Sequence, residues 1–237
     1  MTFIMKDLKT LEKAIGIAFK NKILLKNAFI HRSYLNENKT FELQSNEKLE
    51  FLGDSVLSLI TSVYLYKSYP LLHEGDYTEI KSSIVRTESL AEAALDLGLG
   101  NYLYLSKGEE INNGRENRNI MADCFEALIA VIFIDHGFKK ANFFVTKYLF
   151  KDRLNHLIED KLYLSSKSRL QEYVQSRYKT IPVYKVLEEK GPEHKRIFRV
   201  GVYVREKKKA EGTGASKKEA EERAAHKVLE KLAQFVL

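Results

Sequence analysis

Three carboxylates lie close together in the stretch SNEKLEFLGDSVLSLI, which begins at Ser45. At about 100° per residue, the spacing of Glu47, Glu50 and Asp54 puts them on one face of a helix. Apolar residues fill the opposite side: Leu49, Leu52, Val56, Leu59 and Ile60. Because an amphipathic helix carries its charges on the solvated face, this spacing alone fits an ordinary surface helix as well as a functional site.

A second pair of acids lies in NIMADCFEALIAVIFIDHGF, where Asp123 and Glu126 are neighbours on one helical turn. Apart from these two acids, every residue from Met121 to Ile134 is apolar. A helix that is apolar all round is normally buried. Buried carboxylates repel each other and lose hydration, which is costly unless a base, a shifted protonation state or a bound cation compensates. No base lies within this helix, although one could come from elsewhere in the fold. We favour a divalent cation.

Together the two helices offer four carboxylates as an all-oxygen site: Glu50, Asp54, Asp123 and Glu126. Oxygen ligands select Mg²⁺, with Mn²⁺ as a substitute, and the histidines and single cysteine show no zinc-ligand spacing. Beside a phosphodiester, such a site can activate a water and neutralise charge on the departing 3′ oxygen. No nucleophile elbow or Walker loop is present, and we expect no other cofactor. His31 and Cys124 are interpreted as structural residues.

The elements that must position these acids are helices. Residues 1–160 show apolar spacing of three and four residues over long segments, with turns marked by YPLLHEGDY, LGLGN and KGEEINNGRENRN. The predicted helices run from Leu8 to Phe19, from Leu49 to Leu65, from Tyr77 to Leu97, from Met121 to Ile134 and from Phe138 to Leu154.

The pattern changes after about Lys161. A short helix is predicted in LYLSSKSRLQEYVQSRY with Ser166 or Ser168 as N-cap, followed by strands in VYKVLEE and RIFRVGVYVREKK and a third short strand in EGTGAS. Ser216 and Glu219 form a capping box that opens a last helix. The order predicts a compact module with antiparallel strands and both helices on one face of the sheet.

Charge is distributed unevenly between these regions. The chain of 237 residues has a net charge of +7, and residues 161–237 hold 19 Lys and Arg against 10 Asp and Glu, which leaves 20 and 22 for the rest. A basic region of this kind suggests a polyanion partner, most often nucleic acid. A generic basic domain is the alternative that charge alone leaves open.

Composition restricts the class of protein and its surroundings. The length suits two domains, and 44% hydrophobic with 30% charged residues is typical of a globular protein. The single cysteine excludes an internal disulfide and suits a reducing compartment. The first residues lack the apolar core of a signal peptide, and no apolar run approaches the roughly 18–20 residues that span a bilayer. We predict a cytoplasmic protein without membrane contact.

Several motifs carry a resemblance to a known family. NEKLEFLGDSVL closely resembles the signature of ribonuclease III, the double-stranded-RNA endonuclease, and the match continues with HRSY, EGDYTEIKSSIVR and MADCFEALIAVIFIDHGF in the expected order. The last third resembles a double-stranded-RNA-binding domain through LQEYVQ, GPEHKRIFRV and GTGASKKEAEERAA. The resemblance covers essentially the whole chain.

The resemblance implies a mainly α protein: an all-helical endonuclease domain (1–157), a linker (158–166) and a small α-β-β-β-α double-stranded-RNA-binding domain (167–237). It implies that the metal ligands are Glu50, Asp54, Asp123 and Glu126, with Asp54 and Glu126 as the catalytic residues. Glu47 and Glu74 match supporting acidic positions of the same cleft. Met121, Cys124 and the run RTESLA depart from the usual pattern and put substrate preference in doubt more than activity.

The expected activity is Mg²⁺-dependent hydrolysis of both strands of double-stranded RNA, giving 5′-phosphate and 3′-hydroxyl ends with short 3′ overhangs. Ribosomal RNA precursors and structured messenger RNAs are the expected substrates. A non-catalytic RNA-binding regulator and a carboxylate-metal nuclease acting on DNA are the alternatives. The presence of all four carboxylates disfavours the first, and the shape-reading module disfavours the second.

A homodimer is expected, because two related sites suit the two strands of a duplex and match the local pseudo-two-fold symmetry of its backbone. Phe51 lies at the edge of the acidic face, either as an interface contact or as a packed core ring.

Recognition of A-form RNA is mainly by shape, and three contact sets are predicted. Gln171 and Glu172 lie on the first helix of the module, and the loop GPEH presents backbone carbonyls at Pro192 together with His194. Lys217 and Lys218 lie on the first turn of the last helix, where free N–H groups also favour phosphates. The alternative for the lysines is a solvated helix end.

Overall fold

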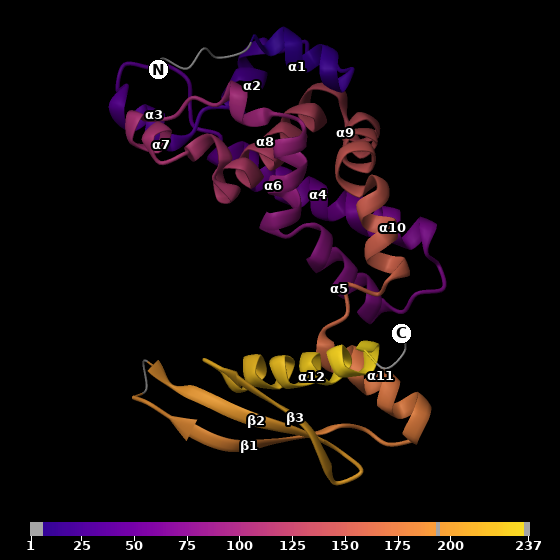
Figure 1. The fold of residues 1–237 in the computed structure, drawn as a ribbon. Helices are drawn as coiled ribbons and strands as arrows, with labels where there is room; N and C mark the ends of the chain where they lie inside the picture. Colours follow the sequence, from indigo (N-terminus) through magenta and orange to yellow (C-terminus); the bar gives the residue numbers. More distant parts are fainter. Residues whose placement is uncertain (1–6, 193–194, 235–237) are drawn as a thin grey trace. The chain divides into compact units, whose positions relative to one another are not determined.

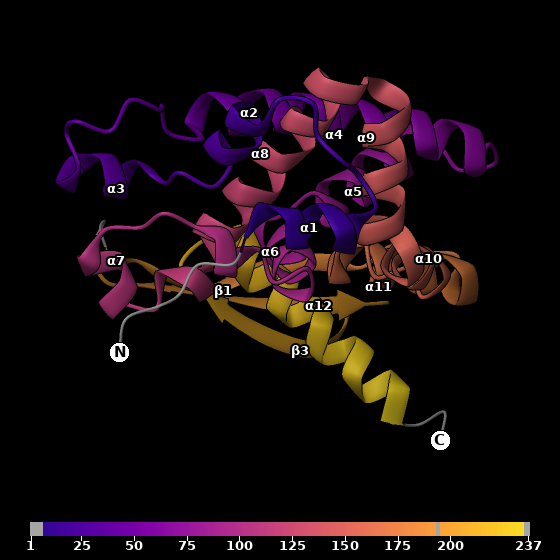
Figure 2. The same cartoon turned by 90° about the horizontal axis from the view of Figure 1, so that it is seen from above.

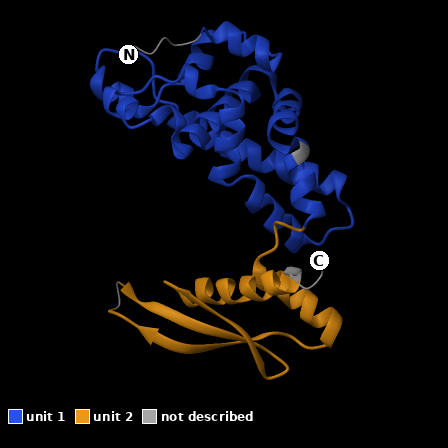
Figure 3. Ribbon diagram, in the orientation of Figure 1, with its two compact units in different colours: residues 1–160 blue, residues 161–237 orange. Residues whose placement is uncertain are grey.

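A computed structural model describes residues 7–192 and 195–234 of the chain. The chain divides into two compact units, residues 1–160 and 161–237 (Figure 3). We call these unit 1 and unit 2. The predicted linker, 158–166, overlaps the last residues of α10 and the first residue of α11, and the predicted domain bounds stay predictions.

Unit 1 is all helical in its described residues (Figure 1). Its longest helices are α4 (Glu47–Ser68) and α8 (Arg118–His136). The other helices are α1 (Leu8–Ile15), α2 (Lys22–Asn27), α3 (Arg32–Glu37), α5 (Glu74–Ile84), α6 (Thr87–Asp96), α7 (Lys107–Ile111), α9 (Phe138–Val145) and α10 (Lys151–Glu159), with short turns η1 (Leu99–Tyr102), η2 (Gly114–Glu116) and η3 (Thr146–Phe150).

The core of unit 1 is built around α8. From Ala127 to Ile132 each residue of this helix is fully buried, as expected for a helix that is apolar all round. Helices α4, α6 and α9 pack against it (Figures 1 and 2). Helices α3 and α7 lie side by side at one end of the unit, joined by the Ser106 N–H that donates to Ser33 Oγ (Figures 1 and 2).

Apolar spacing predicted the helices of unit 1 but not their breaks. The first helix ends at Ile15 because Gly16 adopts a left-handed conformation with φ 71°. The predicted helix from Tyr77 to Leu97 is two helices, separated where Arg86 is extended. The predicted helix from Phe138 to Leu154 is interrupted by η3, one π-helical turn. In each case the prediction of one continuous helix was wrong, since apolar residues keep their spacing across a short break.

Unit 2 has the predicted order of elements. The sheet contains β1 (Val183–Lys190), β2 (Ile197–Val204) and β3 (Lys207–Gly214), antiparallel in the order β1-β2-β3. Helices α11 (Ser166–Tyr178) and α12 (Lys217–Gln234) cover one face of this sheet (Figure 1). Phe198, Val200, Val202 and Val204 of β2 are buried on that face, which confirms the predicted alternation.

Four details of unit 2 differ from the prediction. Strand β3 begins at Lys207, four residues before the predicted strand in EGTGAS. The N-cap of α11 is Ser165, whose side chain accepts from the Ser168 N–H, in place of Ser166 or Ser168. The predicted second strand overran its end, because Arg205 and Glu206 form the turn to β3. At α12, the Glu219 N–H donates to Ser216 Oγ as predicted, but the Glu219 carboxylate accepts from the Ala215 N–H instead of completing the box.

Helix α4 is long and apolar enough, by length and composition alone, to cross a membrane, although no such run was expected from the sequence. The same helix carries Glu47, Glu50 and Asp54 and packs against α8. A core helix passes the same test, so we interpret α4 as the central partner of α8.

Candidate metal centre

The backbones of α4 and α8 come into contact at Gly53. A Cβ at this position would overlap the carbonyl group of Glu126 and lie 3.0 Å from its Cα. Because only glycine permits such close approach, Gly53 determines how near the acids of the two helices come. The sequence prediction assigned it no role, although a glycine inside an otherwise regular helical pattern is the signal of a packing requirement.

Three of the predicted carboxylates meet at this crossing. Glu50 from α4, and Asp123 and Glu126 from α8, each offer an oxygen, and these oxygens lie within 4.8 Å of one another. All three side chains are partly buried. We call this group the acidic cluster.

Within the described residues, the side chains of the acidic cluster form no hydrogen bond and no ion pair with a basic residue, and the same holds for Asp54. Burial, with the charges of Asp54, Glu50 and Asp123, raises the pKa of Glu126 to about 8. Burial and the charges of Asp123 and Glu47 also raise the pKa of Glu50. Uncompensated carboxylate oxygens are the donors that a hard divalent cation prefers, so the cluster fits such an ion.

Arg32 is a basic side chain whose positive charge acts on the acidic cluster. Burial raises the pKa of Asp123, and the charge of Arg32 partly opposes that rise. The Arg32 Nη1 lies 3.8 Å from Glu47 Oε1, in an exposed pair, and Ser45 Oγ donates to the same Glu47 carboxylate at 2.7 Å. Glu47 is thus held by exposed partners beside the cluster.

A hollow of about 610 Å³ opens next to the acidic cluster. Its lining includes Glu47, Glu50 and Asp123 together with Arg32, Asn36 and Asn119. Because Glu109 also lines the hollow, four acids there oppose the single base Arg32. The net charge of the lining is negative, so a polyanion enters only when a bound cation offsets this charge.

Two residues before α4 line the hollow and are held by hydrogen bonds. His31 caps α3, where its Nδ1 lies 2.8 Å from Ser33 Oγ, and burial lowers its pKa. This agrees with the predicted structural role. The buried Asn46 connects the start of α4 to the preceding chain through its N–H, which donates to the Ile30 carbonyl at 2.9 Å, and through its amide, which donates to Ala28.

The remaining predicted residues of unit 1 lie outside the three-carboxylate group. Asp54 is exposed, one turn along α4 from Glu50, and its charge is the largest contribution after burial to the raised pKa of Glu126. Glu74 begins α5 and accepts from Thr78 Oγ1 at 3.2 Å, and it does not line the hollow. Phe51 is 79% exposed, which excludes a packed core ring in this chain.

Cys124 lies between two members of the acidic cluster along the sequence but points elsewhere. It is fully buried, and burial raises the pKa of its thiol. The interpretation of Cys124 as a buried core residue is confirmed.

The predicted RNA-contacting residues of unit 2 are spread over three elements. Gln171 and Glu172 are exposed on α11, and the Glu172 carboxylate pairs with Lys161 at 2.8 Å. The Pro192 carbonyl accepts from the Lys195 N–H at 2.8 Å. His194 lies outside the described residues.

Lys217 and Lys218 are exposed on the first turn of α12. The Lys217 Nζ lies 5.6 Å from the centre of the Phe198 ring, and neither lysine forms an ion pair among the residues described. Free N–H groups at this end of α12 add to their charge.

Comparison with known proteins gives matches over both units. The family described as Ribonuclease-III-like matches residues 21–153, and the Double-stranded RNA binding motif matches residues 166–232. Ribonuclease 3 of Dehalococcoides mccartyi is 42% identical over 226 residues, covering 95% of each chain. Ribonuclease 3 of Pelotomaculum thermopropionicum is 43% identical over 224 residues, covering 94% of this chain and 92% of that one.

A solved structure is also similar to unit 1. The nuclease domain of ribonuclease III from Campylobacter jejuni, described as showing structural flexibility in a region involved in dimer formation, is 34% identical with a TM-score of 0.57. The match covers 61% of this chain and 97% of that domain.

Proposed function

The chain belongs to the ribonuclease III family and is an endoribonuclease with a double-stranded-RNA-binding domain, and from this premise we propose that it hydrolyses both strands of duplex RNA in a Mg²⁺-dependent reaction. The products have 5′-phosphate and 3′-hydroxyl ends with short 3′ overhangs. The substrates are ribosomal RNA precursors and structured messenger RNAs in the cytoplasm.

The acidic cluster is the observation that carries this proposal. Glu50, Asp123 and Glu126 are crowded within 4.8 Å without a basic partner among the described residues, an arrangement that is unfavourable unless a cation or a proton is added. The pKa of Glu126 is raised to about 8 for the same reason, burial beside other negative charges. A bound Mg²⁺ or Mn²⁺ resolves it with the oxygen ligands that these ions prefer.

Each acid has a proposed part in the reaction. Glu50, Asp123 and Glu126 hold the ion, and Asp54 joins them as the fourth ligand from the exposed edge of α4. When bound, the ion lowers the pKa of a water and neutralises charge on the departing 3′ oxygen. Asp54 and Glu126 are the catalytic pair. Glu47 adds negative charge to the lining of the cleft, and Glu74, at the start of α5 outside that lining, is a more distant supporting acid.

The homodimer is proposed from Phe51 and the surface around it. An aromatic side chain that is 79% exposed on the helix bearing the site is free to contact a second copy, and burying its apolar area there would stabilise the pair. A two-fold pair would present two sites, one for each strand. Sedimentation of Phe51→Asp tests this: we expect a monomer, and a variant that stays dimeric would exclude the contact.

Unit 2 is proposed to bind the duplex by shape. Gln171 and Glu172 meet one minor groove, Pro192 and His194 the next, and Lys217 and Lys218 the phosphates between them. Their positions on the exposed surface of α11, on the β1–β2 connection and at the start of α12 support this assignment.

Cleavage of a labelled duplex by Asp54→Asn and Glu126→Gln tests the reaction. We expect a rate at least 10³-fold lower for each variant, because a ligand of the ion is lost, with duplex affinity within about twofold of the parent in the absence of metal. Normal turnover by both variants would exclude the carboxylate mechanism. A parent protein that binds but never cuts, with or without Mg²⁺, would favour the RNA-binding regulator.

A further inference from the structure

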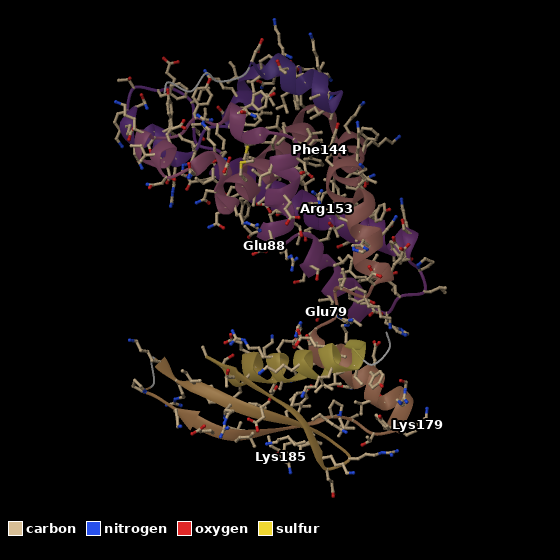
Figure 4. All side chains as sticks on the ribbon, viewed as in Figure 1. Glu79, Glu88, Phe144, Arg153, Lys179 and Lys185 are labelled. Atoms are coloured by element: carbon tan, nitrogen blue, oxygen red, sulfur yellow. The ribbon has the colours of Figure 1, made fainter. Side chains whose placement is uncertain are left out.

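A second group of basic side chains lies in unit 2, apart from the proposed RNA contacts. These residues are exposed at or near the turn between β2 and β3 and at the end of α11. We call them the hairpin patch: Lys179, Lys185, Arg205, Lys207, Lys208 and Lys209. Figure 4 shows Lys179 where α11 ends and Lys185 on the side of the sheet away from α12.

The hairpin patch lies at the opposite end of the strands from Pro192 and Lys217, whereas Gln171 and Glu172 lie on α11, which packs against Val202 and Val204 near the hairpin end. Strand β2 begins at Ile197, beside the β1–β2 connection, and ends at Val204, beside Arg205. Phe198 pairs with Gly214, just before α12, so Lys217 belongs to the Ile197 end. At about 3.3 Å per residue, the eight residues of β2 separate the two ends by roughly 23 Å.

The charge of the hairpin patch is largely uncompensated. Lys208 pairs with Glu211 at 2.5 Å, but the other five members form no ion pair within the described part of the chain. Elsewhere on the sheet the bases are neutralised: Arg199 pairs with Glu188 at 3.1 Å, and Arg196 with Glu189 at 2.9 Å. At the other end of the sheet, such ion pairs accompany the unpaired Lys217 and Lys218, whereas five of the six members of the hairpin patch are unpaired among the described residues.

The backbone is left-handed at two members of the hairpin patch and at the acid between Arg205 and Lys207, and none of the three is glycine. Lys179 has φ 54°, Arg205 φ 48° and Glu206 φ 66°. Glycine or asparagine is preferred both after a helix and in a two-residue hairpin turn with positive φ. A strained conformation persists where something other than local stability requires the residue. At Lys179 and Arg205, what the side chain adds is a long cation.

Aromatic rings hold two of the cations in place. The Arg205 guanidinium lies 5.0 Å from the Tyr178 ring centre, and its Nη2 donates to the Tyr178 carbonyl at 3.3 Å. The Lys185 Nζ lies 5.1 Å from the centre of the Tyr203 ring. Cations fixed in this way lose less side-chain entropy when an anion binds.

We propose that the hairpin patch binds the phosphate backbone of a second RNA helical segment, distinct from the duplex held by Gln171, Pro192 and Lys217. The inference rests on duplex RNA as the partner of unit 2 and adds a second contact to it. A group of uncompensated cations at one end of the sheet suits a phosphate backbone, which requires charge without base reading. RNAs with a branch or a sharp bend present such a second segment.

Binding of two RNAs by the full-length chain tests this, in EDTA and followed by anisotropy. One RNA is a blunt duplex of about 16 base pairs, the length that such a domain spans, and the other is a three-way junction that contains this duplex as one arm. For Lys207→Gln/Lys209→Gln we expect junction affinity to fall three- to tenfold. The salt slope should fall by roughly 1.4–1.8, for about two lost phosphate contacts. Affinity for the short duplex should stay within twofold.

Two matched variants separate the possible outcomes. Lys139→Gln/Lys140→Gln removes the same charge from exposed positions on α9 and should change neither affinity. Lys217→Gln/Lys218→Gln should weaken binding of both RNAs, and if it weakens neither, the proposed duplex contacts fail independently of the hairpin patch. Two results for Lys207→Gln/Lys209→Gln would overturn the proposal: an equal loss of affinity for both RNAs, or an unchanged affinity for the junction. An unchanged affinity would point to an acidic protein as the partner of the hairpin patch.

Arg205→Asn separates a role of Arg205 in RNA binding from a role in the fold, because thermal midpoint and junction affinity are measured on the same variant. Asparagine tolerates positive φ, so we expect the thermal midpoint to stay equal or rise while junction affinity falls two- to fivefold. A lower midpoint with unchanged junction affinity would show that Arg205 serves the fold alone, against the proposal.

Discussion

The two units carry charge in opposite ways. In unit 1, Glu50, Asp123 and Glu126 are partly buried and crowded within 4.8 Å. In unit 2, the bases are exposed, and several are neutralised by neighbours such as Glu188 and Glu211. Burial makes each charge of the first group costly, whereas solvent screens each charge of the second. Single changes in unit 1 should therefore have large effects, and those in unit 2 should be small and graded.

The largest effect is expected at the contact between α4 and α8, the two helices that bring the acids together. Gly53→Val places a side chain against the Glu126 backbone, so α4 and α8 must separate. We expect the free energy of unfolding of unit 1 to fall by roughly 3 kcal/mol and cleavage to fall by at least 10²-fold. Chemical denaturation and a cleavage assay measure the two effects.

Gly75→Ala is the matched control, because a Cβ at Gly75 meets nothing within 4 Å. Its stability should change by less than about 1 kcal/mol, with normal cleavage. If Gly53→Val behaves like this control, the contact between the helices does not set the site.

The next effect concerns the pH dependence of stability without metal. The pKa of Glu126 is about 8 in the folded chain, above its ordinary value of 4.5. Between these pH values the folded state keeps a proton that the unfolded state has lost, so stability falls as pH rises from about 4.5 to 8. Because Glu126 is partly exposed, solvent screens its charge. We therefore expect the free energy of unfolding to fall by roughly 1–3 kcal/mol over this pH range.

Glu126→Gln should abolish that part of the pH dependence and be more stable than the parent at pH 8 in EDTA. Denaturation curves at pH 5 and pH 8 measure the difference, and Mg²⁺ should stabilise the parent more than the variant. If the stabilities of the parent and the variant change equally between pH 5 and pH 8, the pKa of Glu126 is not raised in the folded chain.

A smaller effect is expected at the start of α12. Lys217→Gln/Lys218→Gln should weaken duplex binding about tenfold near physiological salt and lower the salt slope by roughly 1.4–1.8. The cleavage rate at saturating RNA should stay close to the parent value. A large fall in that rate with unchanged affinity would contradict the separation of roles between the units.

The smallest effect is expected for an exposed ion pair of the sheet. Glu189→Gln removes the pair with Arg196, and we expect a change of at most about 0.5 kcal/mol in the free energy of unfolding. Arg196→Gln should give a similar value. A loss of several kcal/mol in either variant would mean that unit 2 also depends on individual charges.

The sequence alone was sufficient for the elements that repeat a simple pattern. Apolar spacing predicted α8, which is buried on all sides over several residues, and alternation predicted β2, which packs one face against the core. The breaks were missed where the cause is a single backbone conformation, as at Gly16 and Arg86. The N-cap Ser165 was missed by one residue, since adjacent serines offer the same side chain.

The site was predicted as four carboxylates, and the structure brings three of them together in one group. Side-chain types and spacing indicated which acids share a helix face, but not which pair of helices touches. Gly53 and Arg32 were missed for the same reason, because their importance depends on the residue across the interface. No periodicity within one helix contains that information.

The burial of Cys124 has a practical consequence. It is the only cysteine of the chain, and as a fully buried thiol with a raised pKa it reacts slowly with maleimides and oxidants. A cysteine introduced at an exposed position can therefore be labelled selectively without first replacing the native one. Pairs of fluorophores, one on each unit, can then follow how the two halves move in solution when RNA is added.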